Sequence, residues 1–323
     1  MISVIIPAYN SQQSIERCLV SVLSQNNASF EVIVVDDGST DKTLALCRGM
    51  EKLDSRLRVF HQSNQGASAA RNYGMKQAQG EWIVFVDSDD QVSPNYLSRM
   101  CSCCSQSTDI DLYVGSLNVY RDGKKHEVLQ LDSCIVNASD LHKIFGIIKL
   151  HKHGFSVAKM YRRSILEQHN IRFNSKVNMA EDCILMMNYI LACGHSEKSL
   201  IYCDDEANYD YYVKSGSLST RLGSYEQEYR NYEAVREIVH EIIKRIHRGD
   251  VRKELLSSVG WYGDRCINAI YITSGQNKDV RLKHIKQIDS SELTFRHDEN
   301  AKQWMLKWLL KMGLYRLYDF MRC

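Results

Sequence analysis

Three groups of polar residues carry the chemistry that this sequence can perform. The densest is Asp87-Ser88-Asp89-Asp90, which directly follows an apolar run at 82–86. Three carboxylates so close together repel one another unless a cation lies among them. Oxygen ligands suit Mg²⁺ or Mn²⁺, which bind one or two carboxylates together with phosphate oxygens and neutralise charge on a departing phosphate. The alternative is a solvated loop in which Ser88 or Asp89 caps the next helix. A second acidic group elsewhere in the sequence favours the metal site over this loop.

That second acidic group is the run DDGSTD at 36–41. Ser39 or Asp41 is a good N-cap for the following helix, so part of the run is structural. Asp36 and Asp37 come at the end of an apolar segment, where carboxylates can accept hydrogen bonds from a ribose or from a nucleotide base. The alternative, in which the whole segment is turn chemistry, stays open.

The third group, Pro7, Tyr9 and Asn10, follows the first apolar segment of the chain. Further along, small residues beginning at Gly66 open a helix and allow a ligand to approach the backbone closely. Helix N-termini attract phosphate, and Arg71 can reach the same place. Neither GxGxxG nor GxxxxGK[ST] occurs, so the sequence supports neither a dinucleotide-binding fingerprint nor a P-loop.

The elements that must position these groups alternate over the first hundred residues. Short runs rich in Val, Ile and Phe are separated by helical stretches, a pattern typical of parallel strands with both faces covered. The sequence therefore predicts an α/β fold with a mostly parallel, doubly wound sheet. Ligands bind at the carboxyl ends of strands in such a sheet, so all three polar groups should line one edge. The predicted strands are 3–6, 30–35, 57–60 and 82–86, and the helices are 14–25, 41–51 and 66–79.

Beyond residue 105 the strand–helix alternation is less regular. A DG turn joins two segments with the composition of a β-hairpin. From residue 224 onward the pattern is helical and contains no proline. The predicted elements are the hairpin strands 111–120 and 126–131, helices near 139–148, 162–169 and 180–193, strands near 200–204 and 207–213, and helices 224–248, 251–272 and 298–321.

Composition indicates a globular protein with a substantial core. The 323 residues are 44% hydrophobic and 25% charged, with a net charge of +2, which gives no overall nucleic-acid footprint. Residues 1–221 carry 23 basic and 25 acidic side chains, whereas 222–323 carry 18 and 14. Neither a signal-peptide pattern nor a run of eighteen apolar residues is present. The eleven cysteines therefore indicate reduced thiols in the cytosol.

The motifs together resemble a known family. The runs PAYN, EVIVVDDGSTD and NQGASAARNYGMKQAQGEWIVFVDSDD, within residues 2–100, closely resemble the N-terminal domain of family 2 inverting glycosyltransferases. AKMYRR, IRF and AED, between 158 and 182, resemble more weakly the acceptor-side half of bacterial members, in which Trp or Gly often stands where this chain has Met179-Ala180. Residues 209–212, followed by 217–219, are similar to a further segment, and nothing after about 222 matches.

This resemblance implies an A-type glycosyltransferase fold over residues 1–221, with a nucleotide-sugar half at 1–105 and an acceptor half at 106–221. The helical pattern of the sequence adds a C-terminal extension at 222–323. It also implies a UDP-sugar donor and Mn²⁺ or Mg²⁺ as cofactor. Carried over position by position, the roles are Asp37 facing uracil, Asp87 facing ribose, Asp89 holding the metal, Asp90 and Arg71 near the diphosphate, and Asp182 as general base.

The chemistry of inverting transfer agrees with that general base. One carboxylate must take the proton of the acceptor hydroxyl during in-line attack, and no second catalytic acid is required. Glu181 is expected to contact acceptor hydroxyls or to support the base. Because the pair begins a helical run, one of the two could equally serve as an N-terminal helix charge.

The tail at 302–323 has five basic residues and one acidic residue. Its large apolar side chains, Trp304, Trp308, Leu309, Met312, Tyr315 and Phe320, fall roughly on one helical face. This pattern suits an interfacial helix on anionic lipid, and equally a helix that packs its aromatics on its own domain. Gly313 favours a bend.

We therefore expect transfer of a hexose or N-acetylhexosamine to a bacterial glycan such as an O-antigen, capsule or lipopolysaccharide. A lipid-linked acceptor such as an undecaprenyl-diphosphate saccharide would place the enzyme in the cytoplasm, at the inner face of the membrane, with no nucleic-acid partner. Two other classes stay open. A nucleotidyltransferase would carry a Gly-rich, basic first loop where this chain has PAYN, and a non-catalytic sugar-binding relative would have lost the base or metal carboxylates.

Overall fold

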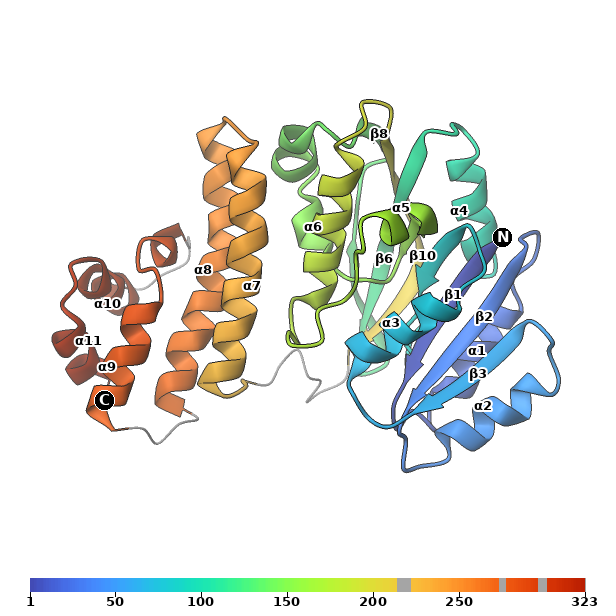
Figure 1. Ribbon diagram of the computed structural model, residues 1–323, viewed down its shortest axis with the longest axis horizontal. Helices are drawn as coiled ribbons and strands as arrows, with labels where there is room; N and C mark the ends of the chain where they lie inside the picture. Colours follow the sequence, from blue (N-terminus) through green and yellow to red (C-terminus); the bar gives the residue numbers. More distant parts are fainter. Residues whose placement is uncertain (214–221, 273–276, 296–300, 323) are drawn as a thin grey trace. The chain divides into compact units, whose positions relative to one another are not determined.

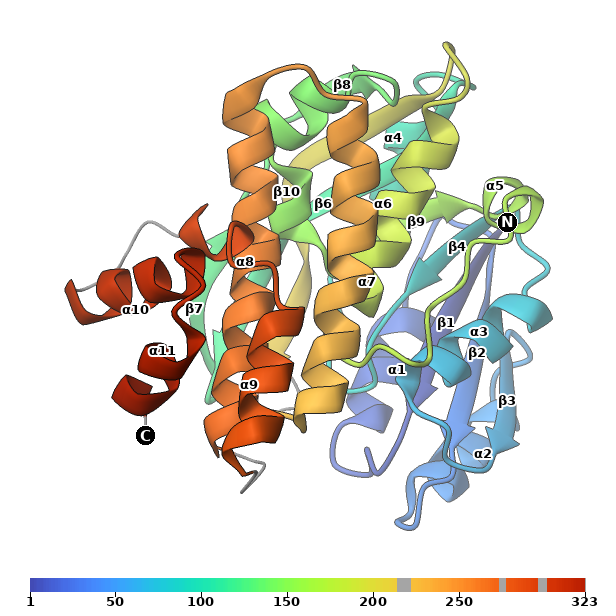
Figure 2. The same cartoon turned by 60° about the vertical axis from the view of Figure 1, so that its left-hand side comes forward.

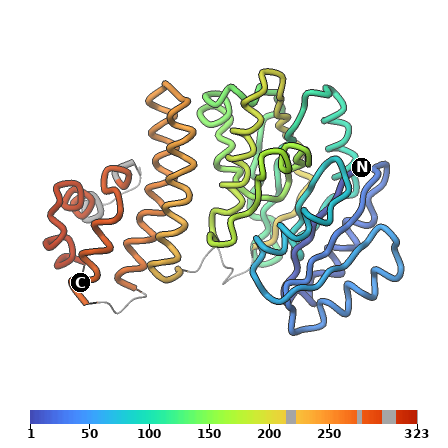
Figure 3. The backbone as a smooth tube through the Cα atoms, in the orientation of Figure 1, coloured from blue at the N-terminus to red at the C-terminus, as the bar shows by residue number. Residues whose placement is uncertain are grey.

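A computed structural model of the chain describes residues 1–213, 222–272, 277–295 and 301–322. The chain divides into two compact units. The first comprises the described residues up to 213, apart from two short segments, Phe145–Ile147 and Lys176–Ala180. These segments belong with residues 222–322 in the second unit, in which the backbone trace of the described residues is helical (Figure 3).

The first unit begins with four parallel strands in the order β3-β2-β1-β4. Every residue of β1 and β2 is buried, as expected for strands covered on both faces. The predicted alternation of strands and helices is confirmed, with bounds that shift by a few residues. The elements are β1 (Ile2–Ala8), α1 (Ile15–Leu23), β2 (Phe30–Asp37), α2 (Thr43–Glu51), β3 (Leu57–Gln62), α3 (Ala67–Gln77) and β4 (Trp82–Phe85).

This strand order fixes where a ligand can bind. The chain steps from β1 outward to β3 and then crosses back to β4, so right-handed crossovers place α1 and α2 on one face and α3 on the other (Figure 1). The direction reverses between β1 and β4, which makes their carboxyl ends a topological switch point. Asp87 lies two residues after the end of β4, at this point of the sheet edge.

The sheet continues beyond β4 as a mixed sheet. A short strand, β9, runs antiparallel to both β4 and β6, and β10 runs parallel to β6. Two edge strands, β5 and β8, pair with β10, and β7 pairs with β6. The bounds are β5 (Gln91–Val92), β6 (Ile110–Arg121), β7 (Lys124–Leu129), β8 (Cys134–Asn137), β9 (Lys159–Arg162) and β10 (Leu200–Val213).

Several expectations for this half need adjustment. The DG turn is confirmed, with Asp122 and Gly123 both at positive φ between β6 and β7. The two strands expected near 200–213 are a single strand, β10, with register irregularities on either side of Ala207. The helices between residues 96 and 193 are α4 (Tyr96–Cys104), α5 (Arg163–Gln168), α6 (Glu181–Cys193), a π-helical turn η1 (Lys143–Ile147) where a longer helix was expected, and a 3₁₀ turn η2 (Leu150–His153).

In the second unit, α7 and α8 pack side by side (Figure 2). Buried Glu292 anchors this unit by accepting hydrogen bonds from the Tyr232 hydroxyl, Arg236 and His240 at 2.6, 2.9 and 2.7 Å. The bounds are α7 (Tyr225–Lys244), α8 (Gly249–Ile272), α9 (Lys278–Gln287), η4 (Glu292–Phe295), α10 (Ala301–Lys311) and α11 (Tyr315–Arg322).

The tail forms two helices instead of the single one predicted. Gly313 lies between them with φ +71°, a conformation that ends α10 and that side chains other than glycine rarely adopt. No single apolar face therefore runs through the tail. The expected start at 298–300 lies outside the described residues, and so does the side chain of Trp304.

Exposure of the tail side chains bears on the two alternatives left open for the apolar face. Leu309, one of the residues on that face, is 3% exposed and packs inside the unit. The exposed apolar residues are Trp308, Met312, Leu314, Leu317 and Phe320, and Phe320 is 80% exposed. Across the part of the chain that the structure describes, no helix combines the length and apolar character needed to cross a membrane.

Candidate active site

Side chains far apart in the sequence meet around Arg71, on helix α3. Its guanidinium lies 2.8 Å from an Asp87 oxygen, 3.4 Å from an Asp182 oxygen and 3.9 Å from a Glu181 oxygen. Asp87 comes from the end of β4, and the acidic pair begins α6. The structure thus brings together the donor-side and acceptor-side residues that the sequence singled out.

The charge on Arg71 is strongly stabilised by these neighbours. The residue is 5% exposed, and burial alone would lower the pKa of its guanidinium. The carboxylates of Asp182, Asp87 and Glu181 outweigh burial and raise that pKa. The guanidinium also lies over the ring of Phe173, 5.3 Å from its centroid. Arg71 is therefore a fixed positive charge among three carboxylates.

Asp182 is held at both of its oxygens. The Ser156 backbone N–H and hydroxyl each donate to Oδ2 at 3.0 Å, and Arg71 approaches Oδ1. Ser156 is fully buried, so it fixes the orientation of the carboxylate. The Asp182 side chain keeps 23% of its surface exposed, which leaves it accessible to an acceptor. Ser156 carried no sequence signal that would have marked it.

Glu181 experiences a different environment from its neighbour. Burial, with the negative charge of Asp182 adding to it, raises the pKa of the Glu181 carboxyl to about 7, and Arg71 opposes the shift. This carboxyl therefore gains and loses its proton near neutral pH. Because the two adjacent carboxyl groups have such different surroundings, one of them can carry a proton while the other accepts one.

The aspartates that follow β4 differ in burial and in their hydrogen bonds. Asp90 is fully buried, and it accepts hydrogen bonds from the Tyr209 hydroxyl at 2.7 Å and the Tyr212 N–H at 2.8 Å. Burial, followed by the charges of Asp87 and Asp89, raises its pKa well above the usual value. Asp90 thus braces the loop against β10, whereas Asp87 and Asp89 are partly exposed, and a metal bound by these three aspartates stays a prediction.

The donor set here fits a hard cation with few protein ligands. Within the residues covered by the structure, no three His, Cys, Asp or Glu side chains are grouped so as to hold a metal. Asp87 nevertheless lies with the acidic pair around the buried guanidinium of Arg71, and Asp89, two residues further on, has a partly exposed side chain. Mg²⁺ and Mn²⁺ commonly bind one or two carboxylates and take the remaining ligands from substrate phosphates. The residues therefore fit a cation that arrives with a diphosphate.

The second acidic group organises the loop before α3. Asp37 accepts hydrogen bonds from Gln62, from the Gln65 N–H and from the Gly66 N–H, at 2.8, 2.9 and 2.8 Å. Gly66 is the N-cap residue of α3 and has φ +89°. Asp37 thus holds the entry to the helix that carries Arg71. Its contact with a base stays a prediction.

Asp36 is fully buried and reaches the neighbouring strand. One of its oxygens lies 2.7 Å from Nδ1 of His61, and Oδ1 has no hydrogen-bond partner among the described residues. His61, on β3, had not been singled out from the sequence. A buried, unpaired carboxylate oxygen at a strand end is an acceptor suited to a polar ligand or a water molecule.

Some of the polar groups that follow β1 make hydrogen bonds within the protein. The Asn10 side-chain oxygen accepts from the Thr40 N–H at 2.8 Å, and the backbone N–H of Asn10 donates to the Ser39 hydroxyl at 2.9 Å. Pro7 is buried, whereas Tyr9 is 49% exposed beside this junction. The Ser88 hydroxyl lies 2.7 Å from that of Ser11. These contacts tie the loops after β1, β2 and β4 into one edge.

Sequence reasoning missed the aromatic and basic residues that support this edge. Tyr209 lies in a segment whose similarity to the family was noticed, but its bond to Asp90 could not be read from spacing. Lys159, fully buried on β9, donates to the Phe155 carbonyl at 2.6 Å. Burial lowers the pKa of its amine to about 8, although the Asp182 carboxylate opposes the shift.

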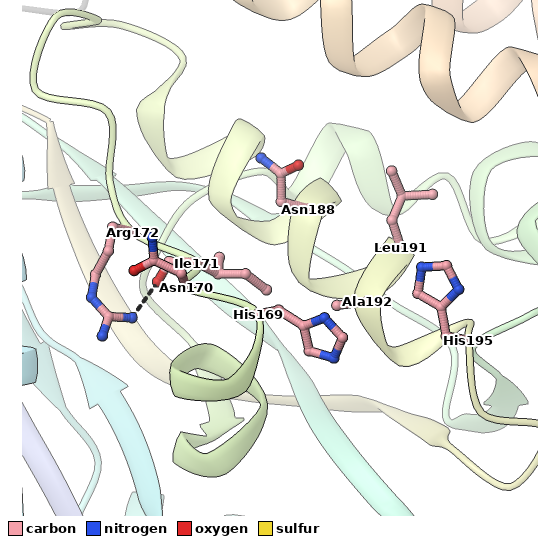
Figure 4. A pocket seen from close by; sticks show the side chains of 8 residues that line it. All are labelled: His169, Asn170, Ile171, Arg172, Asn188, Leu191, Ala192 and His195. Carbon is pink, nitrogen blue, oxygen red and sulfur yellow. Dashed lines mark hydrogen bonds between the residues drawn. The ribbon is translucent and has the colours of Figure 1, made fainter.

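A separate cavity of about 360 Å³ lies on the first unit, away from this edge. Figure 4 shows His169 and His195, whose nearly parallel rings have centroids 6.4 Å apart. Arg172 donates to the Ile171 carbonyl at 2.8 Å. None of the residues that line this cavity is acidic, and none is among the candidate site residues.

The fold and the site together define a class of protein. The first four strands form a parallel sheet that continues as a mixed sheet, with an acidic run after β4 and an acidic pair at the start of α6. This arrangement is typical of the A-type glycosyltransferase fold. The structure of S. aureus TarS 1–349 in complex with UDP-GlcNAc matches this fold with a TM-score of 0.70 and 22% identity, over 99% of this chain and 90% of that one.

Residues 3–169 match the family described as Glycosyl transferase family 2, and the chain belongs to that family. It is 32% identical to the succinoglycan biosynthesis protein ExoO of Rhizobium meliloti (strain 1021) over 230 residues, which are 68% of this chain and 63% of ExoO. It is 34% identical to EpsH of Bacillus subtilis (strain 168) over 176 residues, 53% of this chain and 50% of EpsH. The chain thus spans about half to two thirds of the length of these relatives.

Proposed function

We propose that this chain transfers a hexose or N-acetylhexosamine from a UDP-sugar to a saccharide acceptor, with inversion and with a divalent cation. The convergence of Arg71, Asp87 and Asp182 at the switch point of the sheet carries the proposal. Two kinds of relative support it. TarS 1–349 has been solved with UDP and with UDP-GlcNAc, and ExoO is named for succinoglycan biosynthesis.

In the proposed mechanism, Asp182 takes the proton of the attacking acceptor hydroxyl. Oδ2 accepts two hydrogen bonds from Ser156, whereas Oδ1 accepts only the longer one from Arg71, so we assign the proton to Oδ1. Glu181 lies beside it and can hold an acceptor hydroxyl through a hydrogen bond. A single carboxylate suffices for inversion, because the leaving group is a nucleoside diphosphate that departs without a protein acid.

The donor diphosphate is proposed to lie near Asp87, Asp89 and Arg71. The two aspartates would hold Mn²⁺ or Mg²⁺, which supplies Lewis-acid stabilisation of charge on the diphosphate. Arg71 adds a fixed positive charge that needs no rearrangement during the reaction. Asp37 and the loop that it braces are proposed to receive the uracil, with the ribose near Asp87.

A thermal-shift panel tests the donor. UDP, UDP-glucose, UDP-N-acetylglucosamine, a GDP-sugar and a dTDP-sugar are each combined with Mn²⁺, Mg²⁺ or EDTA. A ligand at 100 times its dissociation constant stabilises the folded chain by about 2.7 kcal/mol, which a melting curve resolves. Metal-dependent stabilisation by UDP and one UDP-sugar is expected. Stabilisation by GDP or dTDP compounds alone would contradict the donor.

We further propose that the enzyme works at the cytoplasmic face of a membrane in bacterial surface-polysaccharide assembly, on an acceptor such as an undecaprenyl-diphosphate-linked saccharide. Exposed Leu314, Leu317 and Phe320 lie near Lys311 and Arg316 in the sequence of the tail, a combination that suits an anionic lipid surface. Co-sedimentation with vesicles containing phosphatidylglycerol tests this contact. Phe320→Glu should weaken it, whereas Val20→Glu, at an exposed apolar residue of α1, should not. Equal binding of both variants would contradict the proposal.

A further inference from the structure

Two cysteines that are not among the candidate site residues face each other across neighbouring strands. Cys134 on β8 and Cys203 on β10 are direct partners in the antiparallel register. Directly opposed residues share a face of the sheet, with Cα atoms about 4.5 or 5.5 Å apart depending on the hydrogen-bonding position. Both separations lie within the range of about 4.4–6.8 Å that a disulfide requires. The Cα separation of the pair is therefore compatible with a disulfide.

Access to the two thiols differs in a way that suits stepwise oxidation. β8 is an edge strand, paired only with β10 among the described strands (Figure 1). Cys134 on this edge is partly exposed, whereas Cys203 is fully buried. An oxidant in solution therefore reaches Cys134 first. The Cys203 thiol is inaccessible to solvent and lies opposite Cys134. Both are free thiols in the structure.

The electrostatics favour Cys134 as the attacking group. A hydrogen bond from the Cys203 thiol, together with the nearby charge of Lys143, lowers the pKa of Cys134 to about 6, against the opposing effect of burial. The lowered pKa increases the fraction of Cys134 that is present as the reactive thiolate at neutral pH. The same hydrogen bond and burial raise the pKa of Cys203, which remains protonated.

We propose that Cys134 and Cys203 form a reversible dithiol–disulfide pair that reacts with small disulfides such as glutathione disulfide. Cys134 thiolate attacks one sulfur of the small disulfide, which forms a mixed disulfide and expels one small thiolate. Cys203 then attacks the Cys134 sulfur, and its proton passes to the second departing thiolate. In total, two electrons pass to the small disulfide, which leaves as two thiols. A pair of this kind is compatible with a reducing compartment, where disulfides are transient.

The experiment uses the full chain in buffers with defined ratios of glutathione to glutathione disulfide. After rapid alkylation and digestion without reductant, mass spectrometry should find the Cys134 and Cys203 peptides joined and lighter by two hydrogens, and dithiothreitol should separate them. Cys101→Ser is the matched control, because Cys101 is also partly exposed, and it should leave the joined peptide unchanged. Cys203→Ser should instead trap the glutathione adduct on Cys134.

A second measurement needs no variant. The rate of alkylation of Cys134 by iodoacetamide in the wild-type chain should rise with pH and reach half its plateau near pH 6. Persistent glutathione on Cys134 in the wild-type chain, or an unmodified pair at all ratios, would overturn the proposal. A half-plateau above pH 8 would overturn it as well.

Discussion

Replacement of Glu181 by Gln should stabilise the protein at alkaline pH and leave it nearly unchanged in acid. The wild-type carboxyl lies beside Asp182 and is largely buried, and its pKa rises from 4.5 to about 7 on folding. A folded-state pKa above the unfolded value means that the folded protein binds this proton more tightly. The stabilisation is complete below pH 4.5 and is lost as pH rises through 7.

The size of the effect follows from the shift. Each unit of pKa difference corresponds to about 1.4 kcal/mol, so the wild-type chain loses about 3 kcal/mol from this residue between pH 4.5 and pH 8. Glutamine is close to the protonated carboxyl in shape and carries no charge. Glu181→Gln should therefore match the wild type near pH 4.5 and exceed its unfolding free energy by about 3 kcal/mol near pH 8.

Urea unfolding of the two proteins at several pH values between 4.5 and 8.5 measures this difference. Glu16→Gln is the matched control, because Glu16 occupies the first turn of α1 as Glu181 occupies that of α6, but it is exposed. Its effect should stay small at every pH. A constant difference between Glu181→Gln and the wild type across the range would refute the electrostatic reasoning, and so would a destabilised variant at pH 8.

Three further changes test other contacts. Tyr209→Phe removes the hydroxyl that donates to a buried carboxylate, so it should lower the unfolding free energy by about 1–3 kcal/mol in urea; an unchanged value would contradict the bracing role. Glu292→Ala leaves Arg236 and its neighbours without their shared acceptor, and should cost about 3 kcal/mol in thermal unfolding, whereas a loss near zero would contradict the network. Asp37→Asn places an amide where the Gly66 N–H needs an acceptor, and should weaken UDP binding about tenfold by calorimetry, with undiminished affinity as the contrary result.

The sequence was most informative where local pattern and fold coincide. Continuous apolar strands and helices at regular intervals predicted the first half of the sheet, and the strand ends then located the acidic residues at one edge. The DG turn was equally local, because two successive residues at positive φ favour Asp-Gly. Resemblance to the family supplied Asp182, and the structure places that residue beside Arg71.

What the sequence could not provide depends on distant contacts. The sequence does not distinguish the three aspartates after β4. In the structure, Asp90 is buried against β10, whereas Asp87 and Asp89 are partly exposed. The short strand β9 has no alternation long enough to mark it, and it exists because β4 and β6 both pair with it. The sequence predicted one helix in the tail because its residues favour a helix throughout. In the structure, the positive φ of Gly313 separates the tail into two helices.

The central claim is that Asp182 takes the acceptor proton at the edge of a donor-binding sheet. Asp182→Asn preserves the size of the side chain and the hydrogen bonds of Ser156, and removes the base. The direct measurement compares UDP affinity by calorimetry, in the presence of Mn²⁺, with the rate of UDP release from the UDP-sugar that stabilises the wild-type chain. The account predicts affinity within about threefold of the wild type and a rate lower by about 10²–10⁴-fold. Undiminished UDP release by Asp182→Asn would contradict it.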